Sequence, residues 1–495
     1  MLKKNSSSNG TYYQEIYRPH LHFTPETMWM NDPNGLVYYK GEYHLFYQYH
    51  PNSKKWGPMH WGHAVSRDLL SWEHLPIALF PDENGLIFSG SCVVDWNNTS
   101  GFFEEEGLVA MFTHADGDIQ SQSIAYSKDR GRTWKKYDGN PVIKNPGITD
   151  FRDPKVLWHE ETEQWIMVLT IGRKVRFYSS SNLIEWNIIS EFGAGWGAQV
   201  GIWECPDLFP LTNEETGETK WILQVGIDKG AHAGGSGTQY FVGHFDGTTF
   251  TPAHEKEDVR WLDFGKDFYA AQSFSDVPDN RQIIIAWMSN WEYANDVPTD
   301  PWRSAMSLPR ELSLRKENGK DIIVQSPVKE IKNLYAASHS IDDLYLKDTE
   351  LFKMRQPQAP FALEMEVDIE AGKMEFHFFT AQEGSSFVFG IDKERQKTYI
   401  KRTHHETVTF AASYEGLFES DLPKTLPINL QVVCDRSSVE IFLNNGQQVW
   451  TNLFLPVLSP DFEIMLQAIN GSGTAKQVRL QELKSVWDKT TATKS

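Results

Sequence analysis

A polar turn that ends in an aromatic residue recurs through the first two thirds of the chain, between short runs of alternating apolar and polar residues. Copies span 66–72, 127–134 and 181–186, each from a Ser to a Trp, and a degenerate copy spans 246–250. In such turns Ser and Asp side chains hydrogen-bond to backbone amides, while the aromatic ring anchors the hairpin. Intervals of roughly 50 to 65 residues fit one four-stranded blade, so the repeat indicates a β-propeller.

Ser-x-Asp turns also close hairpins in many other β proteins, so the number of blades rests on the interval. Counting at this interval over residues 17–326 gives about five blades. We therefore predict an all-β chain whose first domain, residues 17–326, is a five-bladed β-propeller.

The pattern changes at residue 327, where a mixed stretch, 327–346, is predicted to be a linker. Alternation returns over 361–367, 374–379 and 438–443, with one apolar and one polar face per strand. This is typical of a β-sandwich. The second predicted domain, residues 347–488, is therefore a C-terminal β-sandwich, which we expect to brace the propeller and to offer contacts for a homodimer.

The charge balance limits the partners of the chain. With 495 residues and a formal net charge of -19, the chain would be repelled by nucleic acid and by anionic membrane surfaces. No run approaches the roughly 18 apolar residues of a membrane span. Residues 1–10 lack the apolar core of a secretory signal, so we expect a cytoplasmic protein.

The cysteine and histidine patterns predict neither a disulfide nor a bound metal. Cys92, Cys205 and Cys434 lie far apart and lack the paired spacing of a zinc site or a disulfide framework. Four histidines lie closer together, but not at the usual ligand spacing on strands: His20, His22, His60 and His63. We expect these side chains in the core or in hydrogen bonds, and we expect no cofactor.

Three acidic residues stand beside aromatic residues and prolines: Asp32 in WMNDPNG, Asp153 in FRDP and Glu204 in WECPD. Asp-Pro is also an ordinary turn former, and the proline predicts an extended backbone for Asp32 and Asp153. All three fall at the beginning of predicted blades, where innermost strands aim side chains into a central channel. Because buried carboxylates are costly unless paired or used, such a cluster indicates chemistry.

These segments resemble the motifs of glycoside hydrolase family 32, the invertases, inulinases and levanases, and the resemblance extends over essentially the whole chain. WMNDPNG is similar to the nucleophile motif of that family, FRDP to its Arg-Asp-Pro motif and ECP to its acid/base motif. The resemblance implies a five-bladed propeller followed by a sandwich. It also implies a retaining exo-β-fructofuranosidase that releases terminal fructose from levan, inulin, fructo-oligosaccharides and sucrose.

The resemblance assigns a role to each carboxylate. It implies that Asp32 attacks the anomeric C2 of fructose, that Glu204 is the acid/base and that Asp153 binds fructose hydroxyls and stabilises the transition state. A retaining reaction needs two carboxyl groups about 5 to 5.5 Å apart, one ionised and one protonated. A neighbouring Arg152 favours the ionised form of Asp153. Cys205 is expected to be a buried structural thiol, not a nucleophile.

Other positions match the fructose pocket of the family, where a small polyol needs hydrogen-bonding groups and apolar walls. Trp291 is predicted to form a subsite wall, although core packing is the alternative for it and for Trp56. The predicted substrate-binding residues are Asn31, Gln48, Trp56, Phe88, Ser89, Arg152 and Trp291.

Three loop stretches bear on specificity: 59–64, 94–101 and 291–298. They resemble exo-acting levanases and inulinases more than bacterial sucrose-6-phosphate hydrolases, so we predict a fructan exohydrolase that also cleaves sucrose. Two alternatives share the three carboxylates: an invertase acting mainly on sucrose, and a transfructosylase in which a sugar captures the intermediate. Because Asp32 and Glu204 are both present in intact motifs, a non-catalytic fructan-binding protein and an inverting arabinan or xylan hydrolase are disfavoured.

Overall fold

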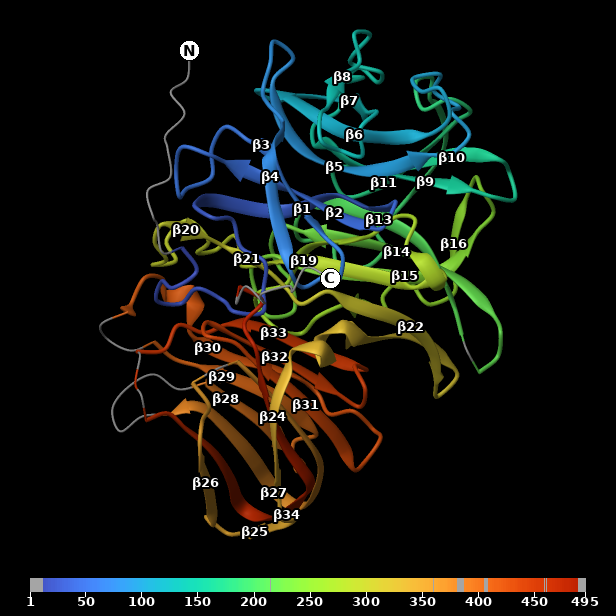
Figure 1. Cartoon of the computed structure of the whole chain (residues 1–495). Coiled ribbons are helices and arrows are strands. Elements are labelled where there is room, and N and C mark those ends of the chain that lie inside the picture. The colour runs from blue at the N-terminus through green and yellow to red at the C-terminus, as the bar shows by residue number, and fades with distance from the viewer. Residues whose placement is uncertain are drawn as a thin grey trace.

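The computed structural model describes residues 12–487 except 214, 359, 381–386, 405–407, 458 and 460. The described residues form strands, turns and short 3-10 segments in two domains: five separate sheets of four or five strands, and a network of eleven strands (Figure 1). The predicted fold class, an all-β chain with a five-bladed β-propeller followed by a β-sandwich, is confirmed. Within the described part of the chain, no helix has the length and apolar character needed to cross a membrane.

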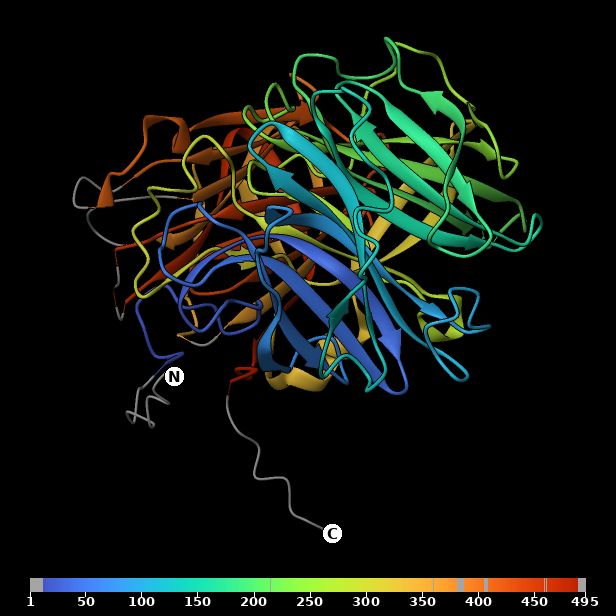
Figure 2. The ribbon, with the colours of Figure 1, turned by 90° about the horizontal axis from the view of Figure 1, so that it is seen from above.

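The five sheets follow one another in chain order, as the colours of Figures 1 and 2 show. The first strands of neighbouring blades contact one another around a closed ring, in the order β1, β5, β9, β13, β18 and back to β1. These five strands are therefore the innermost strands of the propeller. The blades comprise β1 (Met28–Tyr39), β2 (Glu42–His50), β3 (His60–Ser66) and β4 (Trp72–Leu79); β5 (Leu86–Asp95), β6 (Gly107–Asp116), β7 (Ile119–Ser127) and β8 (Lys135–Lys136); β9 (Phe151–His159), β10 (Gln164–Ile171), β11 (Val175–Ser180) and β12 (Asn187–Phe192); β13 (Trp203–Thr212), β14 (Thr219–Ile227), β15 (Gly237–Phe245), β16 (Phe250–Pro252) and β17 (Arg260–Trp261); and β18 (Tyr269–Ser273), β19 (Gln282–Met288), β21 (Ala305–Met306), β22 (Arg310–Glu317) and β23 (Lys320–Pro327).

The recurring polar turn joins the last two strands of a blade, as predicted. In the first copy the Trp72 indole N–H donates to the Leu69 carbonyl at 3.0 Å, and the indoles that end the second and third copies donate in the same way. The third copy begins one residue earlier than predicted, at Ser180, whose hydroxyl accepts a hydrogen bond from the backbone N–H of Asn182 (3.1 Å). The turn therefore stabilises the outer hairpin of a blade through local contacts.

A short strand near the end of the propeller domain pairs with the first innermost strand and so closes the ring of blades. β20 (Trp302–Arg303) pairs in parallel with the start of β1, with Met28 opposite Trp302 and Trp29 opposite Arg303. The backbone N–H of Met28 also donates to the Pro301 carbonyl at 2.8 Å. The innermost strand of the first blade is thus held on one side by its own hairpin and on the other by the last blade.

Two long strands, β27 (Phe361–Thr380) and β34 (Glu463–Leu483), run through both layers of the sandwich. They pair along most of their length, and the register shifts around Ala371. A Cβ on Gly372 or Gly471 would lie 2.5 or 2.0 Å from a carbonyl oxygen of the partner strand, so only glycine fits there. One layer adds β24 (Tyr335–Ile341), β31 (Ile428–Cys434), β32 (Ser438–Leu443) and β33 (Gln448–Leu453), and the other adds β26 (Leu351–Arg355), β28 (Phe387–Asp392), β29 (Lys397–Arg402) and β30 (Gly416–Asp421).

The connection between the domains is shorter than the predicted linker, 327–346. A 3-10 segment at Lys329–Leu334 follows the last propeller strand, and β24 and β25 (Leu344–Lys347) already pair with β34. β24 lies at the edge of its sheet, and its side chains are half-buried or exposed, with none buried. Such a strand has little apolar alternation, which explains why its pattern resembled a linker.

Buried charges join the two domains. His22, from the segment before the first blade, donates to Asp435 and to Glu440 of the sandwich, each at 2.8 Å. Burial alone lowers the pKa of His22, but the two carboxylates outweigh that effect and raise the pKa to about 9. Arg310 of β22 pairs with Glu440 and, at 2.9 Å, with Asp263. The sandwich is therefore fixed to the fifth blade by a paired, fully buried charge network.

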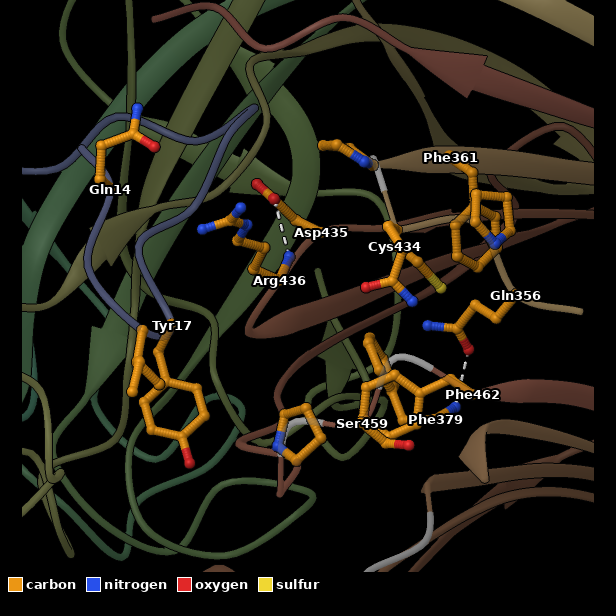
Figure 3. Close-up of a pocket in the computed structure, with 15 residues that line it drawn as sticks. Gln14, Tyr17, Gln356, Phe361, Phe379, Cys434, Asp435, Arg436, Ser459 and Phe462 are labelled. Carbon is orange, nitrogen blue, oxygen red and sulfur yellow. Dashed lines mark hydrogen bonds between the residues drawn. The ribbon is translucent and has the colours of Figure 1, made fainter. Parts of the chain in front are cut away.

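A cavity of about 320 Å³ lies beside this network, between the segment around Tyr17 and the sandwich (Figure 3). Its lining includes the rings of Phe361, Phe379 and Phe462, and Asp435 lies on its wall. None of the three candidate carboxylates lines this cavity. It is a gap between the packed domains, separate from the site described below.

Removing the positive charge of this network tests its contribution to stability. We expect Arg310→Met to destabilise the protein by about 3 to 5 kcal/mol, because Asp263 would stay buried without its charged partner and Glu440 would keep only His22. Thermal unfolding followed by circular dichroism measures the effect. Arg315→Met, on the exposed face of the same strand, is the matched control and should change stability by less than about 0.5 kcal/mol. Equal melting temperatures for the two variants would contradict the prediction.

Candidate active site

Each of the five innermost strands carries a β-bulge at the corresponding place, where two of its residues lie opposite one residue of the neighbouring strand. A bulge bends the strand and redirects the side chains at that point, and here the redirected segments include all three predicted carboxylates. The bulges lie between Met30 and Pro33, Ile87 and Gly90, Arg152 and Lys155, Glu204 and Asp207, and Tyr269 and Gln272.

The bulged ends of the innermost strands surround one cavity of about 240 Å³. All ten residues predicted as catalytic or substrate-binding line it, and Asn295 is a further lining residue. The structure thus brings together side chains that the sequence places more than two blades apart. The ten predicted residues are Asn31, Asp32, Gln48, Trp56, Phe88, Ser89, Arg152, Asp153, Glu204 and Trp291.

Asp32 lies at the closed end of the cavity and accepts hydrogen bonds from neutral donors. The Ser89 hydroxyl donates to Oδ2 at 2.7 Å, and the Asn31 amide donates to Oδ1 at 3.1 Å. The Trp29 indole N–H donates to Asn31 at 2.7 Å and orients that amide. Burial raises the pKa of Asp32, while the Ser89 hydrogen bond opposes the shift and the nearby Glu204 adds to it.

Asp153 does not have the extended backbone that its following proline predicted. Its φ is +63°, in the left-handed region, because the bulge of β9 falls at this residue. Its carboxylate accepts a hydrogen bond from the backbone N–H of Cys205 at 3.0 Å. Burial raises the pKa of Asp153 to about 7, an effect that the Arg152 charge opposes without cancelling. Arg152 thus favours the ionised form of Asp153, as expected, but burial has the larger effect.

Arg152 donates a hydrogen bond to Glu204, with Nη2 2.8 Å from Oε1. Its Nε lies 3.9 Å from the Asp153 carboxylate. The Tyr269 hydroxyl donates to the other oxygen of Glu204, so both oxygens of this side chain have a donor. Arg152 is itself held by Asp150 at 2.6 Å. The Glu204 side chain is 20% exposed and that of Asp153 is 6% exposed, so Glu204 is the more accessible of the two to water.

Cys205 lies between two of the carboxylates. Its sulfur is 3.4 Å from Asp32 Oδ2 and 3.7 Å from Asp153 Oδ2. Burial raises the pKa of the Cys205 thiol well above its ordinary value, and the adjacent carboxylates add to the shift. The thiol therefore stays protonated and serves as a weak hydrogen-bond donor, as the prediction of a structural thiol requires.

The cavity has a buried floor and a more exposed rim. Gln48 belongs to the floor, where its amide donates to Asn34 at 2.9 Å and to the Ile87 carbonyl at 3.0 Å. Trp56, at the rim, is 45% exposed, and its backbone N–H donates to the Asn295 side chain at 2.9 Å. Neither Trp56 nor Trp291 is fully enclosed in the core, although Trp291 packs against Trp29.

Below the floor a buried ion pair joins two of the innermost strands. Lys155 follows the bulge of β9, and its amine lies 3.3 Å from Asp207, which follows the bulge of β13. The same amine donates to the Ser273 carbonyl at 2.6 Å. Lys155 also lines a second cavity beyond this pair, which shares no lining residue with the cavity around Asp32, so the cavity around Asp32 is closed at this end.

Two residues of the site were not predicted from the sequence. Tyr269 occupies the same bulge position in β18 that Glu204 occupies in β13. Extending the count of innermost strands to the fifth blade would have identified it. Asn295 lies within 291–298, a stretch singled out for specificity without naming this residue. Among the described residues, no group of three or more His, Cys, Asp or Glu side chains is arranged to hold a metal ion.

The site defines a class of enzyme. Three carboxylates converge at the blind end of a small cavity, beside amide and hydroxyl groups and under an aromatic rim, and this is the arrangement of a glycoside hydrolase. Residues 22–327 match the model of the glycosyl hydrolases family 32 N-terminal domain, and residues 330–484 match that of the family 32 C-terminal domain. The chain belongs to glycosyl hydrolase family 32.

Individual relatives agree with the family. The chain is 48% identical to a levanase of Bacillus subtilis, over 98% of this chain and 73% of the relative. It is 36% identical to an exo-inulinase of Aspergillus awamori whose crystal structure superposes with a TM-score of 0.89, covering 96% of this chain and 100% of that one. A β-fructofuranosidase of Schwanniomyces occidentalis complexed with fructosyl-erythritol is 34% identical, with a TM-score of 0.84, and covers 95% of this chain and 98% of that one.

The Ser89 hydrogen bond tests the pKa of Asp32. Ser89→Ala removes a donor that stabilises the ionised carboxylate, so the pKa of Asp32 should rise further. If activity requires ionised Asp32, the acidic limb of the kcat/KM profile for sucrose should move about one unit to higher pH. Ser91→Ala is the control, because the Ser91 hydroxyl donates to the Pro154 carbonyl and not to a carboxylate. A limb that stays in place in Ser89→Ala would refute the prediction.

The raised pKa of Asp153 predicts a cost in stability at high pH. The folded-state pKa, about 7, lies above the ordinary value of 3.8, so stability falls as the pH rises from about 4 to about 7 and stays reduced above that range. At pH 8 the free energy of unfolding of Asp153→Asn should therefore exceed that of the wild type by about 1 to 4 kcal/mol, and the variant should melt at a higher temperature. Both differences should vanish near pH 4. Thermal melts at several pH values measure it. The exposed Asp118→Asn control should show no such pH-dependent gain.

Proposed function

We propose that the chain is a retaining exo-β-fructofuranosidase that hydrolyses terminal fructose from levan, inulin, fructo-oligosaccharides and sucrose. The observation that carries the proposal is the separate hydrogen bonding of Asp32 and Glu204 at one cavity: Asp32 has neutral donors, and Glu204 has Arg152 and Tyr269. Two carboxyl groups in different environments suit two different roles. The names of the relatives, levanase and exo-inulinase, support the substrate class.

In the first step, an oxygen of ionised Asp32 forms a bond to C2 of the terminal fructosyl unit. The bond from C2 to the glycosidic oxygen breaks, and protonated Glu204 gives its proton to that oxygen. Glu204 is left as a carboxylate, which the Arg152 guanidinium and the Tyr269 hydroxyl stabilise. The product of this step is a fructosyl ester of Asp32 and a free acceptor sugar.

In the second step, the Glu204 carboxylate takes a proton from water, and the water oxygen attacks C2. The ester bond breaks, which restores ionised Asp32 and protonated Glu204 and releases fructose with retained configuration. Asp153, with the deeply buried carboxyl, is placed to hydrogen-bond fructose hydroxyls and to stabilise positive charge that develops at C2.

The closed end of the cavity supports exo action. A polysaccharide cannot pass through the centre of the propeller, because the cavity around Asp32 shares no lining residue with the cavity beyond it, which the buried Lys155 lines. Only the end of a chain can therefore reach Asp32, and the rest of the substrate must leave the cavity past the rim formed by Trp56, Trp291 and Asn295. Aromatic rims of this kind suit the apolar faces of sugar rings.

Sugar release tests the proposal. The wild type should release fructose alone from inulin and levan, and Glu204→Ala should lose at least about a hundredfold in rate, as expected for a general acid. Chromatography of the products over time gives both results. Glu185→Ala, an exposed glutamate in a blade turn, is the matched control and should keep wild-type activity.

Other outcomes would change the proposal. Early release of oligosaccharides from fructans would indicate endo cleavage, and longer oligosaccharides formed from concentrated sucrose would indicate a transfructosylase. Activity on sucrose without activity on fructans would indicate an invertase. Full activity of Glu204→Ala would show that the acid is another residue. A homodimer through the sandwich and a cytoplasmic location stay predictions, which light scattering and cell fractionation test.

A further inference from the structure

A buried arginine of the sandwich reaches the fifth blade close to the active site. Arg402, at the end of β29, is fully buried, and its Nη1 donates to Asp267 at 2.6 Å. Its Nη2 donates to the hydroxyl of Tyr293 at 3.0 Å, and that hydroxyl in turn donates to the other oxygen of Asp267. The three side chains, from two domains, form one closed set of hydrogen bonds.

Tyr293 lies in the turn that carries part of the cavity rim. The turn begins at Asn290, whose carbonyl accepts hydrogen bonds from the backbone N–H groups of Tyr293 (3.1 Å) and Ala294 (2.9 Å). Trp291 and Asn295, on either side of Tyr293 in sequence, line the cavity, while Tyr293 itself points away and is buried. A shift of Tyr293 would therefore move the backbone that joins the two rim residues.

The two ends of this turn make hydrogen bonds to the propeller. The Asn290 amide donates to the Lys266 carbonyl at 2.8 Å, and the backbone N–H of Trp291 donates to Ser236 at 3.2 Å. At the other end, Arg303 donates to the Asn295 carbonyl at 2.5 Å. The middle of the turn, at Tyr293, is the part that is held through the charge of Arg402.

We propose that Arg402 is a positioning residue for substrate specificity, through which the sandwich holds Trp291 and Asn295 in place against the part of the fructan chain that leaves. This rests on the proposed function, because it assigns the rim to the acceptor side of the cleaved bond. The fructosyl unit itself binds deeper, on Asp32, Asp153 and Glu204, and contacts residues that Arg402 does not hold. The sandwich thus contributes to recognition without contributing a side chain to the cavity.

The geometry separates this role from support of the catalytic carboxylates. Asp267 precedes β18 and so lies near Tyr269, which binds Glu204. Asp267 also accepts a hydrogen bond from the backbone N–H of Leu453 at 2.8 Å, in addition to that of Arg402. Removing only the Tyr293 hydroxyl leaves both of these contacts intact. The start of β18 then stays in place, and only the rim turn loses a restraint.

Tyr293→Phe is the decisive variant, since it keeps the buried ring and removes the hydroxyl. We expect KM for inulin to rise about two- to tenfold, the range that corresponds to the loss of one hydrogen bond. The kcat for inulin and the inhibition constant of fructose should stay within about a factor of two, because the deep part of the cavity is unchanged. Arg402→Lys, if it folds, should raise KM in the same direction.

Tyr414→Phe is the matched control. Tyr414 packs against the same guanidinium, 3.8 Å from its ring centre, but its hydroxyl hydrogen-bonds only to backbone groups of Leu453 and Leu455 in the sandwich. It should lower the melting temperature about as much as Tyr293→Phe while leaving KM for inulin unchanged. A merely structural role for the cluster would instead give both variants the same kinetics.

An unchanged KM in Tyr293→Phe, or an equal change in KM and in the fructose inhibition constant, would overturn the positioning role while leaving the proposed function intact. A wild type that binds fructose but releases none from inulin or sucrose would instead overturn the proposed function, and this inference with it. A selective rise of KM in Tyr293→Phe, absent from Tyr414→Phe, supports it.

Discussion

The active site depends on one distortion repeated in all five innermost strands. A regular strand would send alternate side chains into the neighbouring blades and pair every backbone group. The extra residue at each bulge breaks that alternation at the corresponding place in every blade, so five strands turn side chains toward a common axis. Asp153 and Cys205 accept left-handed backbone conformations as a result. The chemistry is thus obtained at a cost in local backbone energy.

The second constraint is electrostatic, and it follows from the first. Turning three carboxyl groups into one small cavity removes them from water and places like charges together, which raises the pKa of both Asp32 and Asp153. The surrounding donors are divided unequally: neutral hydroxyl, amide and thiol groups at Asp32, and a guanidinium with a phenol at Glu204. That division distinguishes two carboxyl groups that the amino-acid types alone leave equivalent.

Much of this was predictable from the sequence because it depends on local patterns. The polar turns that end in Trp72, Trp134 and Trp186 mark the first three blades, and the carboxylate motifs stand where innermost strands begin. What escaped prediction depends on contacts between distant segments. The hydrogen bond of Arg152 goes to Glu204 of the next blade, while its neighbour Asp153 lies 3.9 Å away, and β24 is an edge strand whose exposed side chains hide its pairing with β34. No local pattern reveals a partner that another blade or layer supplies.

The parallel pairing of β1 with β20 has a consequence for the order of events during synthesis. The strand that carries Asp32 is synthesised before the other blades, yet its second neighbour, Trp302–Arg303, is made only after four further blades have begun. Domains assemble as units while the chain emerges, and an unpaired strand edge has to wait for its partner. A nascent propeller therefore keeps the start of β1, a few residues before Asp32, as an open edge until the end of the ring has been translated.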